Sequence, residues 1–164
     1  SGLLRSILEQ NRKDFIEIEE EIASLNNYIQ LQQMRYAGAF EYKIAVDNDL
    51  DLNETLIPPM LIQPFVENAI EHGFRNISHK GFLNIAFKTK DNCLLIEVDD
   101  NGSGLTAKVA DKQKKKSLAQ IIIKERFDLL FTSKGQLAHF KVEDKKESAE
   151  KGVLVKILIP IIND

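Results

Sequence analysis

The sequence predicts an α+β fold, a two-layer sandwich in which helices pack on one face of a mixed sheet, and three observations support this prediction. The chain has 164 residues, which is enough for one domain with a sizeable core. Hydrophobic residues make up 43% and charged residues 29% of the chain, as in ordinary soluble globular proteins. Segments with helical and strand period are mixed rather than strictly alternating, which favours helices layered on one sheet.

Composition also limits the classes of partner. The formal charge of −3 gives no general attraction to nucleic acid or anionic membranes, so nucleic acid is not an expected partner. Cys93 is the single cysteine, which excludes a disulfide framework and a cysteine-based zinc site and fits a reducing, cytosolic setting. No apolar run is long enough to cross a bilayer. The stretch Leu3–Leu8 is already in helical rhythm, so we expect a fragment of a longer protein.

The first half of the chain contains two helical patterns and one strand pattern. Apolar residues at spacings of three and four predict an amphipathic helix from Asp14 to about Tyr36, after an N-terminal helical start. The period then changes to two and predicts a half-buried strand over Phe40–Val46. A second helix is predicted to start at Pro58-Pro59, because proline is tolerated in a first turn, and to end at Gly73 as its C-cap glycine.

The second half contains four strand patterns and one helical pattern. Strands are predicted over Phe82–Thr89, Leu94–Val98, Leu137–Val142 and Val153–Ile159, the first two joined by the turn residues Asp91-Asn92. The polar, lysine-rich stretch Thr106–Lys116 predicts a mobile loop, after which Ser117 is expected to cap a helix.

Two segments carry candidate chemistry. In Gln63–Gly73, helical spacing places Glu67, Asn68, Glu71 and His72 on one side. Amide and carboxylate oxygens are suitable ligands for magnesium. A polar helix face in solvent explains the same spacing.

The second segment is Asp100–Gly104, which directly follows a predicted strand. Its glycines allow close approach of the backbone to a ligand, and a carboxylate at a strand end can accept a hydrogen bond from an exocyclic amine. A tight turn explains the same composition.

Taken together and in this order, these segments resemble those of one family. The run Ile57–Gly73 resembles the N box of LytS-like sensor histidine kinases, and Val98–Gly104 resembles their G1 box. Glu20–Tyr36 is similar to the helix before their N box, and Glu125–Leu130 to the helix after their ATP lid. Gly152 with the closing strand is similar to the end of their domain, so the resemblance covers nearly the whole chain.

The resemblance implies a Bergerat-type ATP-binding fold, shared with Hsp90, gyrase B and MutL, that binds Mg-ATP. Asn68 is then the ligand of the magnesium that bridges the phosphates, and Glu67 is the catalytic residue that orients or deprotonates the phosphoryl acceptor. Asp100 accepts a hydrogen bond from the adenine amino group, while Gly102 and Gly104 let the backbone approach the nucleotide. The implied reaction is phosphoryl transfer from ATP to a histidine nitrogen.

The expected phosphate side of the site departs from the family. His72 is expected to point at phosphate or magnesium-bound water. The lid of the family usually carries a Gly-x-Gly-Leu motif, but Lys115–Gln120 contains no glycine. A helix N-terminus at Ser117 would still offer amides to phosphate, and Lys116 positive charge, although a solvated charged loop is an equal alternative. Gly152-Val153 replaces the usual Gly-Thr.

The phosphoacceptor histidine of this family lies upstream, in a His-Phe-x-x-Asn run, and none of His72, His79 and His139 has that context. We therefore expect residues 1–36 to be a helical segment, made of the tail of a missing dimerisation and phosphoacceptor region plus a linking helix. Residues 37–164 are expected to be the ATP-binding domain, which alone should not phosphorylate itself.

The resemblance also implies partners and a location. The whole protein is expected to be a homodimer, with its own phosphoacceptor domain and a LytTR-type response regulator as partners of this domain. It is expected to be a membrane-bound bacterial sensor of a two-component system, with this domain in the cytoplasm. The glycine-free lid motivates an alternative, a degenerate GHKL module that serves in protein interaction or regulation. An ATPase or serine-directed kinase of the same superfamily is disfavoured by the LytS-like N box.

Overall fold

Alternation of apolar and polar residues produces two long paired strands at the centre of the fold. The computed structural model describes residues 14–105, 109–148 and 151–163. In it, β4 (Gly81–Lys90) pairs antiparallel with β5 (Cys93–Asp100). Asp91 and Asn92 join them with positive φ angles of 51° and 63°, which suits the tight turn expected there. One side of the pair is buried, with Leu83, Ile85, Phe87, Leu94, Ile96 and Val98 at most 2% exposed.

Three more strands complete the main sheet, whose order is β2-β4-β5-β7-β6. β2 (Phe40–Val46) runs parallel to β4, whereas β7 (Val153–Pro160) and β6 (His139–Asp144) are antiparallel to their neighbours. The sheet is therefore mixed, as the sequence predicts.

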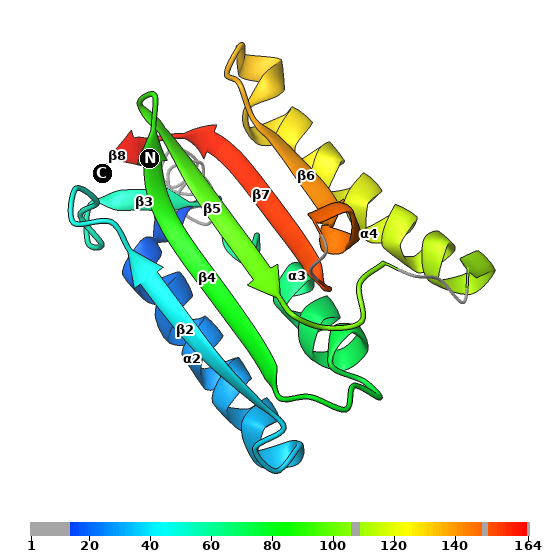
Figure 1. The fold of residues 1–164 in the computed structure, drawn as a ribbon. Coiled ribbons are helices and arrows are strands. Elements are labelled where there is room, and N and C mark those ends of the chain that lie inside the picture. The colour runs from blue at the N-terminus through cyan, green and yellow to red at the C-terminus, as the bar shows by residue number, and fades with distance from the viewer. Residues whose placement is uncertain (1–13, 106–108, 149–150, 164) are drawn as a thin grey trace, which may run out of the picture.

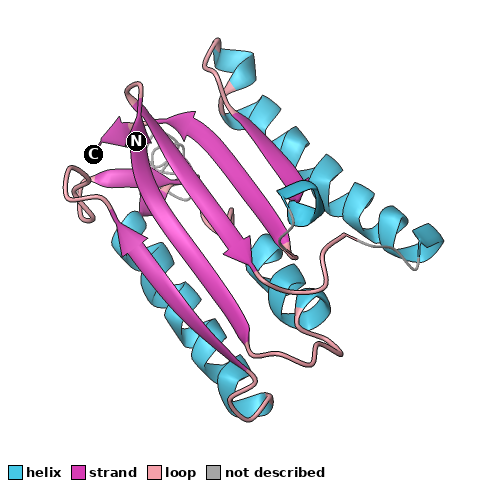
Figure 2. Cartoon of the chain, in the orientation of Figure 1, coloured by secondary structure: helices cyan, strands magenta, loops and turns pink. Residues whose placement is uncertain are grey.

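The helices lie on one side of this sheet (Figures 1 and 2). They are α2 (Ile18–Arg35), α3 (Gln63–Asn68) and α4 (Val109–Leu130), with α3 between the two long helices. Their apolar faces share one core with the sheet, to which they contribute Ile18, Leu25, Ile29, Phe65, Val66, Ile123 and Phe127. No helix within the described ranges is long and apolar enough to span a lipid bilayer.

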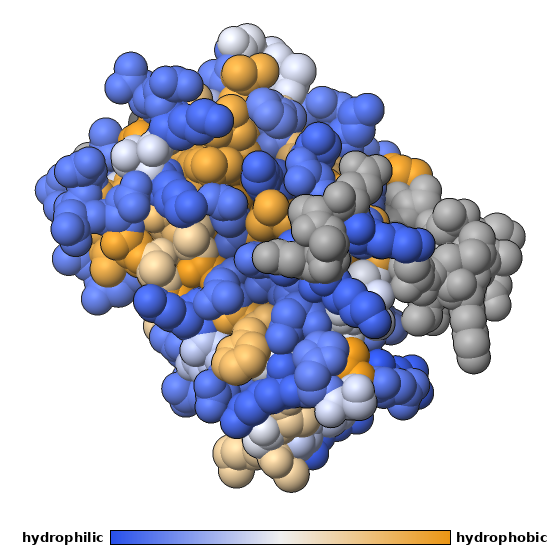
Figure 3. Space-filling model, in the orientation of Figure 1, coloured by the Kyte–Doolittle hydropathy of each residue, from blue (hydrophilic) through white to orange (hydrophobic). Residues whose placement is uncertain are grey.

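The opposite face of the main sheet is open to solvent, and hydrophilic side chains predominate on it (Figure 3). Ion pairs tie neighbouring strands there, for example Lys88 to Glu97 at 2.6 Å. The two-layer α+β architecture expected from the sequence is therefore confirmed.

A second, three-stranded sheet was not predicted. It consists of β1 (Ile16–Glu17), β3 (Thr55–Ile57) and β8 (Ile162–Asn163), in the order β1-β3-β8. Strands of two or three residues are too short to show a period in the sequence. Two short 3₁₀ helices, η2 (Thr132–Lys134) and η3 (Lys145–Ser148), flank β6.

Two helix starts and one helix cap differ from the prediction. α3 begins at Gln63 rather than at the prolines, because Met60 has a φ of +61° and cannot belong to a right-handed helix. Gly73 is not a left-handed C-cap; it ends a π-helical turn, η1 (Ala69–Gly73), and its φ is not positive. α4 begins at Val109, so residues 109–116 are helical and Ser117 lies inside the helix.

The alternation in β5 leads to a stability prediction. Ile96 is fully buried, whereas its neighbour Leu95 faces the opposite side of the sheet and is half-buried. We expect Ile96→Ala to lower the free energy of unfolding by about 2–5 kcal/mol, because it leaves a cavity. Leu95→Ala should cost clearly less in the same chemical denaturation experiment. Equal losses would contradict the assignment of the two faces.

Candidate functional site

The helix that carries the candidate site changes its period in the middle. α3 is α-helical to Asn68, and η1 then continues as a π-helical turn. The N–H of Phe74 donates to the Ala69 carbonyl at 2.9 Å, five residues back. Such π-turns are wider than α-turns and are frequent at functional sites. Asn68 at the end of α3, together with His72 and Gly73 of the turn, lines one pocket, whereas Glu71 is exposed and lines a neighbouring one.

The loop after β5 lies directly against η1. The N–H of Ser103 donates to the Gly73 carbonyl at 2.8 Å. A side chain on Gly102 would collide with the backbone of Gly73, so glycine is required at position 102 for space. Gly152, with a φ of +124°, likewise leaves no room for a side chain next to the Asp100 carbonyl. Three backbone segments therefore meet around Asp100.

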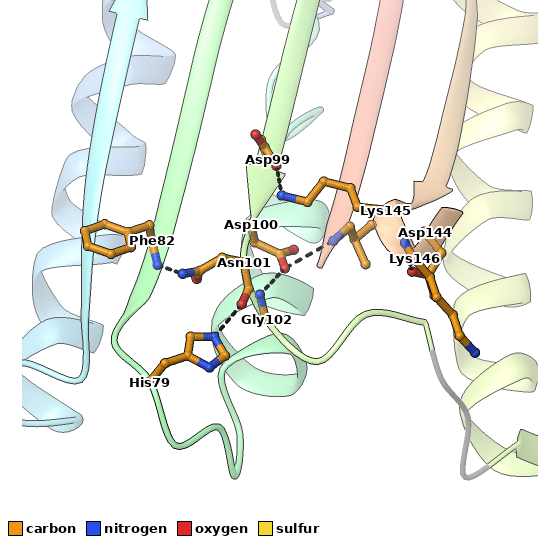
Figure 4. A network of polar contacts seen from close by, with 10 residues as sticks. His79, Phe82, Asp99, Asp100, Asn101, Gly102, Asp144, Lys145 and Lys146 are labelled. Carbon is orange, nitrogen blue, oxygen red and sulfur yellow. Dashed lines mark hydrogen bonds and ion pairs between the residues drawn. The ribbon is translucent and has the colours of Figure 1, made fainter. Parts of the chain in front are cut away.

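Asp100 is a buried carboxylate at the base of the pocket, 5% exposed. Its Oδ1 accepts hydrogen bonds from the N–H of Gly102 at 2.9 Å and the N–H of Val153 at 3.3 Å (Figure 4). Among the described residues no group donates to Oδ2. Burial raises the pKa of Asp100 above its usual 3.8, and the two N–H groups and the charge of Lys145 oppose this only in part.

The pocket above Asp100 is mostly apolar. Strands β5, β6 and β7, helices α3 and α4, and the segment before α4 supply its walls, which include Phe65, Val98, Leu105, Ile123, Val142 and Val155. Asn68, His72, Asp100 and Gln120 are the polar side chains at its surface. An apolar slot with a few fixed polar groups is typical of a site for a flat organic ring.

Glu67 does not line this pocket, although it precedes Asn68. The side-chain amide of Gln63 donates to its Oε1 at 3.2 Å. Burial, followed by the charges of Glu71 and Glu67, raises the pKa of Tyr28 on α2 to about 12. The expectation that all four polar residues share one face of the helix is therefore wrong, because Glu67 lies toward α2 and Asn68 toward the pocket.

Gly104 and the segment that leads to α4 are held by β6. Gly104 has a φ of +80°, and a side chain there would come within 3.2 Å of Asp144 Oδ1. The carboxylate of Asp144 accepts a hydrogen bond from the N–H of Leu105 at 2.9 Å. The next residue, Lys145, donates to Asp99 at 2.6 Å (Figure 4). The sequence did not predict these roles, because Asp144 and Lys145 lie in a charged stretch whose partners become apparent only once the sheet is paired.

Asn101 ties the same loop to the start of β4. Its Oδ1 accepts from the N–H of Phe82 at 2.6 Å, and its Nδ2 donates to the Lys80 carbonyl at 3.0 Å. Nε2 of His79 donates to the Asn101 carbonyl at 2.7 Å (Figure 4). The side chains of Asn101 and His79 therefore fix the backbone directly after Asp100.

Two predicted site residues cannot be placed in full. Lys116 and Ser117 belong to α4, but their side chains fall outside the described part of the chain. The helix start expected at Ser117 is wrong, since α4 begins eight residues earlier. Nucleotide contacts of both residues stay predictions.

The side chains at the pocket fit a magnesium ion that is coordinated mainly by phosphates and waters and only in small part by the protein. Within the described residues, no group of three His, Cys, Asp or Glu side chains is placed to hold a metal. Asn68 and Gln120 offer amide oxygens at the pocket. Magnesium is commonly bound by one or two protein oxygens together with phosphates and waters.

Comparison with known proteins gives the family. A family model described as histidine kinase matches residues 1–40. The sensor protein LytS of Staphylococcus epidermidis is 34% identical over 111 residues, which cover 68% of this chain and 18% of LytS. The sensor protein LytS of Oceanobacillus iheyensis is 30% identical over 167 residues, which cover 99% of this chain and 28% of that protein. The chain thus spans less than a third of these relatives.

Solved structures share the fold. A histidine kinase domain of the blue-light activated kinase EL346 of Erythrobacter litoralis aligns with a TM-score of 0.60 at 19% identity, over 89% of this chain and 62% of that one. Histidine kinase ThkA, solved with the response regulator TrrA, aligns with a TM-score of 0.54 at 16% identity, over 97% and 46%. The fold is therefore that of histidine kinase catalytic domains. By sequence, the chain belongs to the LytS-like sensor histidine kinases.

The close approach of Gly102 to Gly73 can be tested directly. We expect Gly102→Ala to push the two segments apart, costing about 1–3 kcal/mol of stability. Amide hydrogen exchange at Ser103 should then accelerate, because its N–H loses the Gly73 carbonyl. Gly135→Ala is the control for the exchange at Ser103: nothing lies within 4 Å of its added carbon, so its own cost is backbone strain at a φ of +74° and not a clash. Unchanged exchange at Ser103 in Gly102→Ala would refute the contact.

The raised pKa of Asp100 predicts a pH dependence. The carboxyl binds its proton more tightly in the folded than in the unfolded chain, so its contribution to stability is lost as pH rises through the folded-state pKa. Asp100→Asn keeps an acceptor for Gly102 and Val153 without the charge. We expect this variant to be at least as stable as wild type at pH 7, with an advantage that shrinks on acidification. An Asp100→Asn variant that is less stable than wild type mainly at neutral pH would contradict this.

Proposed function

We propose that this chain is the ATP-binding catalytic domain of a two-component sensor histidine kinase. It binds Mg-ATP and transfers the γ-phosphoryl group to a histidine that lies outside this chain. Family membership, the kinase-type fold and the geometry of one pocket support this proposal.

The observation that carries the proposal is the environment of Asp100. The carboxylate is buried at the base of an apolar pocket, and one of its oxygens is occupied by two backbone N–H groups. The second oxygen needs a donor, and the exocyclic amine of adenine is a suitable one. The valine and phenylalanine walls fit the faces of a purine ring. We therefore assign the adenine end of the nucleotide to Asp100.

The phosphate end is assigned to the side of the pocket formed by α3 and η1. Asn68 and His72 lie there, one turn apart, and Gln120 faces them from α4. The proposed role of Asn68 is to bind the magnesium that neutralises phosphate charge. His72 is proposed to orient a phosphate oxygen or a metal-bound water. Gly102 and Gly104 then bring the backbone close to the nucleotide, and Lys116 and Ser117 are proposed to add contacts from α4.

The transfer step needs little covalent chemistry from the protein. The bond between the γ-phosphorus and the bridging oxygen breaks, ADP leaves with the electron pair, and a bond forms to an imidazole nitrogen of the acceptor. Glu67 is the proposed catalytic residue, because a carboxylate beside Asn68 can orient this imidazole and take its proton. Its place on the α2 side of the pocket keeps it apart from the bound adenine.

The whole protein is proposed to be a membrane-bound sensor with this domain in the cytoplasm. The relatives are named sensor proteins, and they extend far beyond the aligned segment. The phosphoacceptor histidine and the dimerisation surface are assigned to that missing part, and a LytTR-type response regulator is the proposed receiver. The solved complex of ThkA with its response regulator TrrA supports this class of partner.

A second candidate is a nucleotide-binding module without kinase activity. The glycine-free stretch Lys115–Gln120, which lies within α4, and the position of Glu67 outside the pocket favour it. Full-length protein that binds ATP but never labels its own histidine would decide for this reading. Radiolabel transfer from γ-labelled ATP is the appropriate measurement.

The site assignment predicts different defects for two variants in calorimetric titrations with and without magnesium. Asp100→Asn should weaken ATP, ADP and AMP alike, by roughly tenfold or more, because it removes the charged acceptor of the adenine amine. Asn68→Ala should weaken Mg-ATP but leave AMP binding nearly unchanged. Asn84→Ala, at an exposed position on β4, is the control. No magnesium-dependent binding to wild type at millimolar ATP would end the proposal, and wild-type affinity in both variants would end the site assignment.

A further inference from the structure

One peptide group in the turn before α3 is held from both ends by charged side chains. The Pro59 carbonyl accepts a hydrogen bond from Nη2 of Arg126 on α4 at 2.6 Å. The N–H of Met60, the other end of the same peptide bond, donates to Oε2 of Glu21 on α2 at 3.3 Å. The two side chains come from the two long helices on either side of α3 (Figure 1).

The backbone at Met60 is in a conformation that L-residues avoid. Its φ is +61°, in the left-handed region, and its side chain is 49% exposed. Packing of that exposed side chain does not explain the conformation. A proline followed by a residue with positive φ is typical of a type II β-turn, whose central peptide is flipped relative to that of the commoner type I turn. Contacts to the Pro59–Met60 peptide itself must therefore stabilise it.

The two charged groups are placed to do this. Glu21 is only 3% exposed, and burial raises its pKa, against the effects of the Met60 N–H and the charge of Arg126. Burial lowers the pKa of Arg126, and Glu21 opposes this shift. Among the described residues the two side chains form no direct salt bridge, so the peptide group lies between them as the link.

The charges also select the orientation of the peptide. As it stands, the carbonyl oxygen meets a guanidinium and the N–H meets a carboxylate. A flip of the peptide would turn the carbonyl toward Glu21 and the N–H toward Arg126, so both contacts would become unfavourable. The pair therefore favours the strained, left-handed Met60 over the relaxed alternative.

We propose that Glu21 and Arg126 are positioning residues that hold the Pro59–Met60 peptide in its flipped orientation and thereby fix α3 and its pocket residue Asn68. Between this peptide and the start of α3 lie only Leu61 and Ile62, both fully buried, so a change in the peptide is passed to the helix. The position of the nucleotide pocket then depends on α2 and α4 together. The consequence for ATP rests on the proposed function, whereas the consequence for the turn does not.

The test first replaces Glu21 and Arg126 and then relieves the backbone strain at Met60. Single replacements leave one buried charge unpaired and risk unfolding, so the double variant Glu21→Gln/Arg126→Met is the starting point. We expect hydrogen exchange at the Met60 amide to accelerate and Mg-ATP to bind roughly tenfold more weakly, the scale of one charge-assisted hydrogen bond. The control is Glu20→Gln/Lys124→Met, which neutralises exposed neighbours on the same two helices and should change neither quantity.

Rescue by glycine separates positioning from general stability. Glycine adopts a φ of +61° without strain, so adding Met60→Gly to the double variant should restore most of the Mg-ATP affinity. A lost packing or charge contribution alone would not be repaired by this change. Failure of the rescue, or wild-type affinity and wild-type Met60 exchange in the double variant, would overturn the proposal. If wild type itself binds no nucleotide, the kinase proposal fails, and the exchange measurement still decides whether the pair holds the turn.

Discussion

The candidate site depends on the direct contact between the backbones of η1 and the loop after β5. Gly73 and Gly102 approach so closely that no side chain on Gly102 fits between them. The hydrogen bond from the Ser103 N–H to the Gly73 carbonyl stabilises this contact. It fixes the distance between the two segments that supply Asp100 on one side and Asn68 on the other, so the width of the pocket is set by main-chain geometry. Pockets defined in this way tolerate little adjustment of their side chains.

The same contact explains why Asp100 is buried and yet retained. A carboxylate in such a place costs desolvation free energy unless it is hydrogen-bonded. Two backbone N–H groups, from Gly102 and Val153, satisfy one oxygen and orient the group. The second oxygen faces a pocket that offers it no donor among the described residues. The folded domain therefore carries a cost at Asp100 that the proposed adenine amino group would relieve. Val153 contributes its main-chain N–H, so the valine in place of the family's threonine leaves this hydrogen bond intact.

Much of the fold could be predicted from local periodicity, and the failures have physical causes. The main strands and the helix Ile18–Arg35 follow their apolar periods, and the turn Asp91-Asn92 follows its residue types. The start of α3 was misplaced because the left-handed conformation of Met60 depends on charges from distant helices. For the site, Asp100 and Asn68 are predicted from family resemblance, since spacing alone also allows a turn and a polar face. Glu67 and Glu71 were wrongly grouped with Asn68 and His72, because adjacent residues of a helix do not face the same side.

The segment formed by α3 and η1 presents different side chains on its two sides, which matters for the proposed kinase activity. Asn68 and His72 line the pocket of Asp100, while Glu67 lies toward Tyr28 on α2. ATP and its acceptor must approach the same phosphorus atom from opposite sides for in-line transfer. A carboxylate on the α2 side can therefore serve an incoming imidazole without contact with the adenine. The same helix α2 supplies Glu21 to the turn that fixes the start of α3. Helix α2 therefore has two roles. It lies on the side from which the acceptor is proposed to arrive, and it supports the pocket through Glu21. A shift of α2 would therefore change both together.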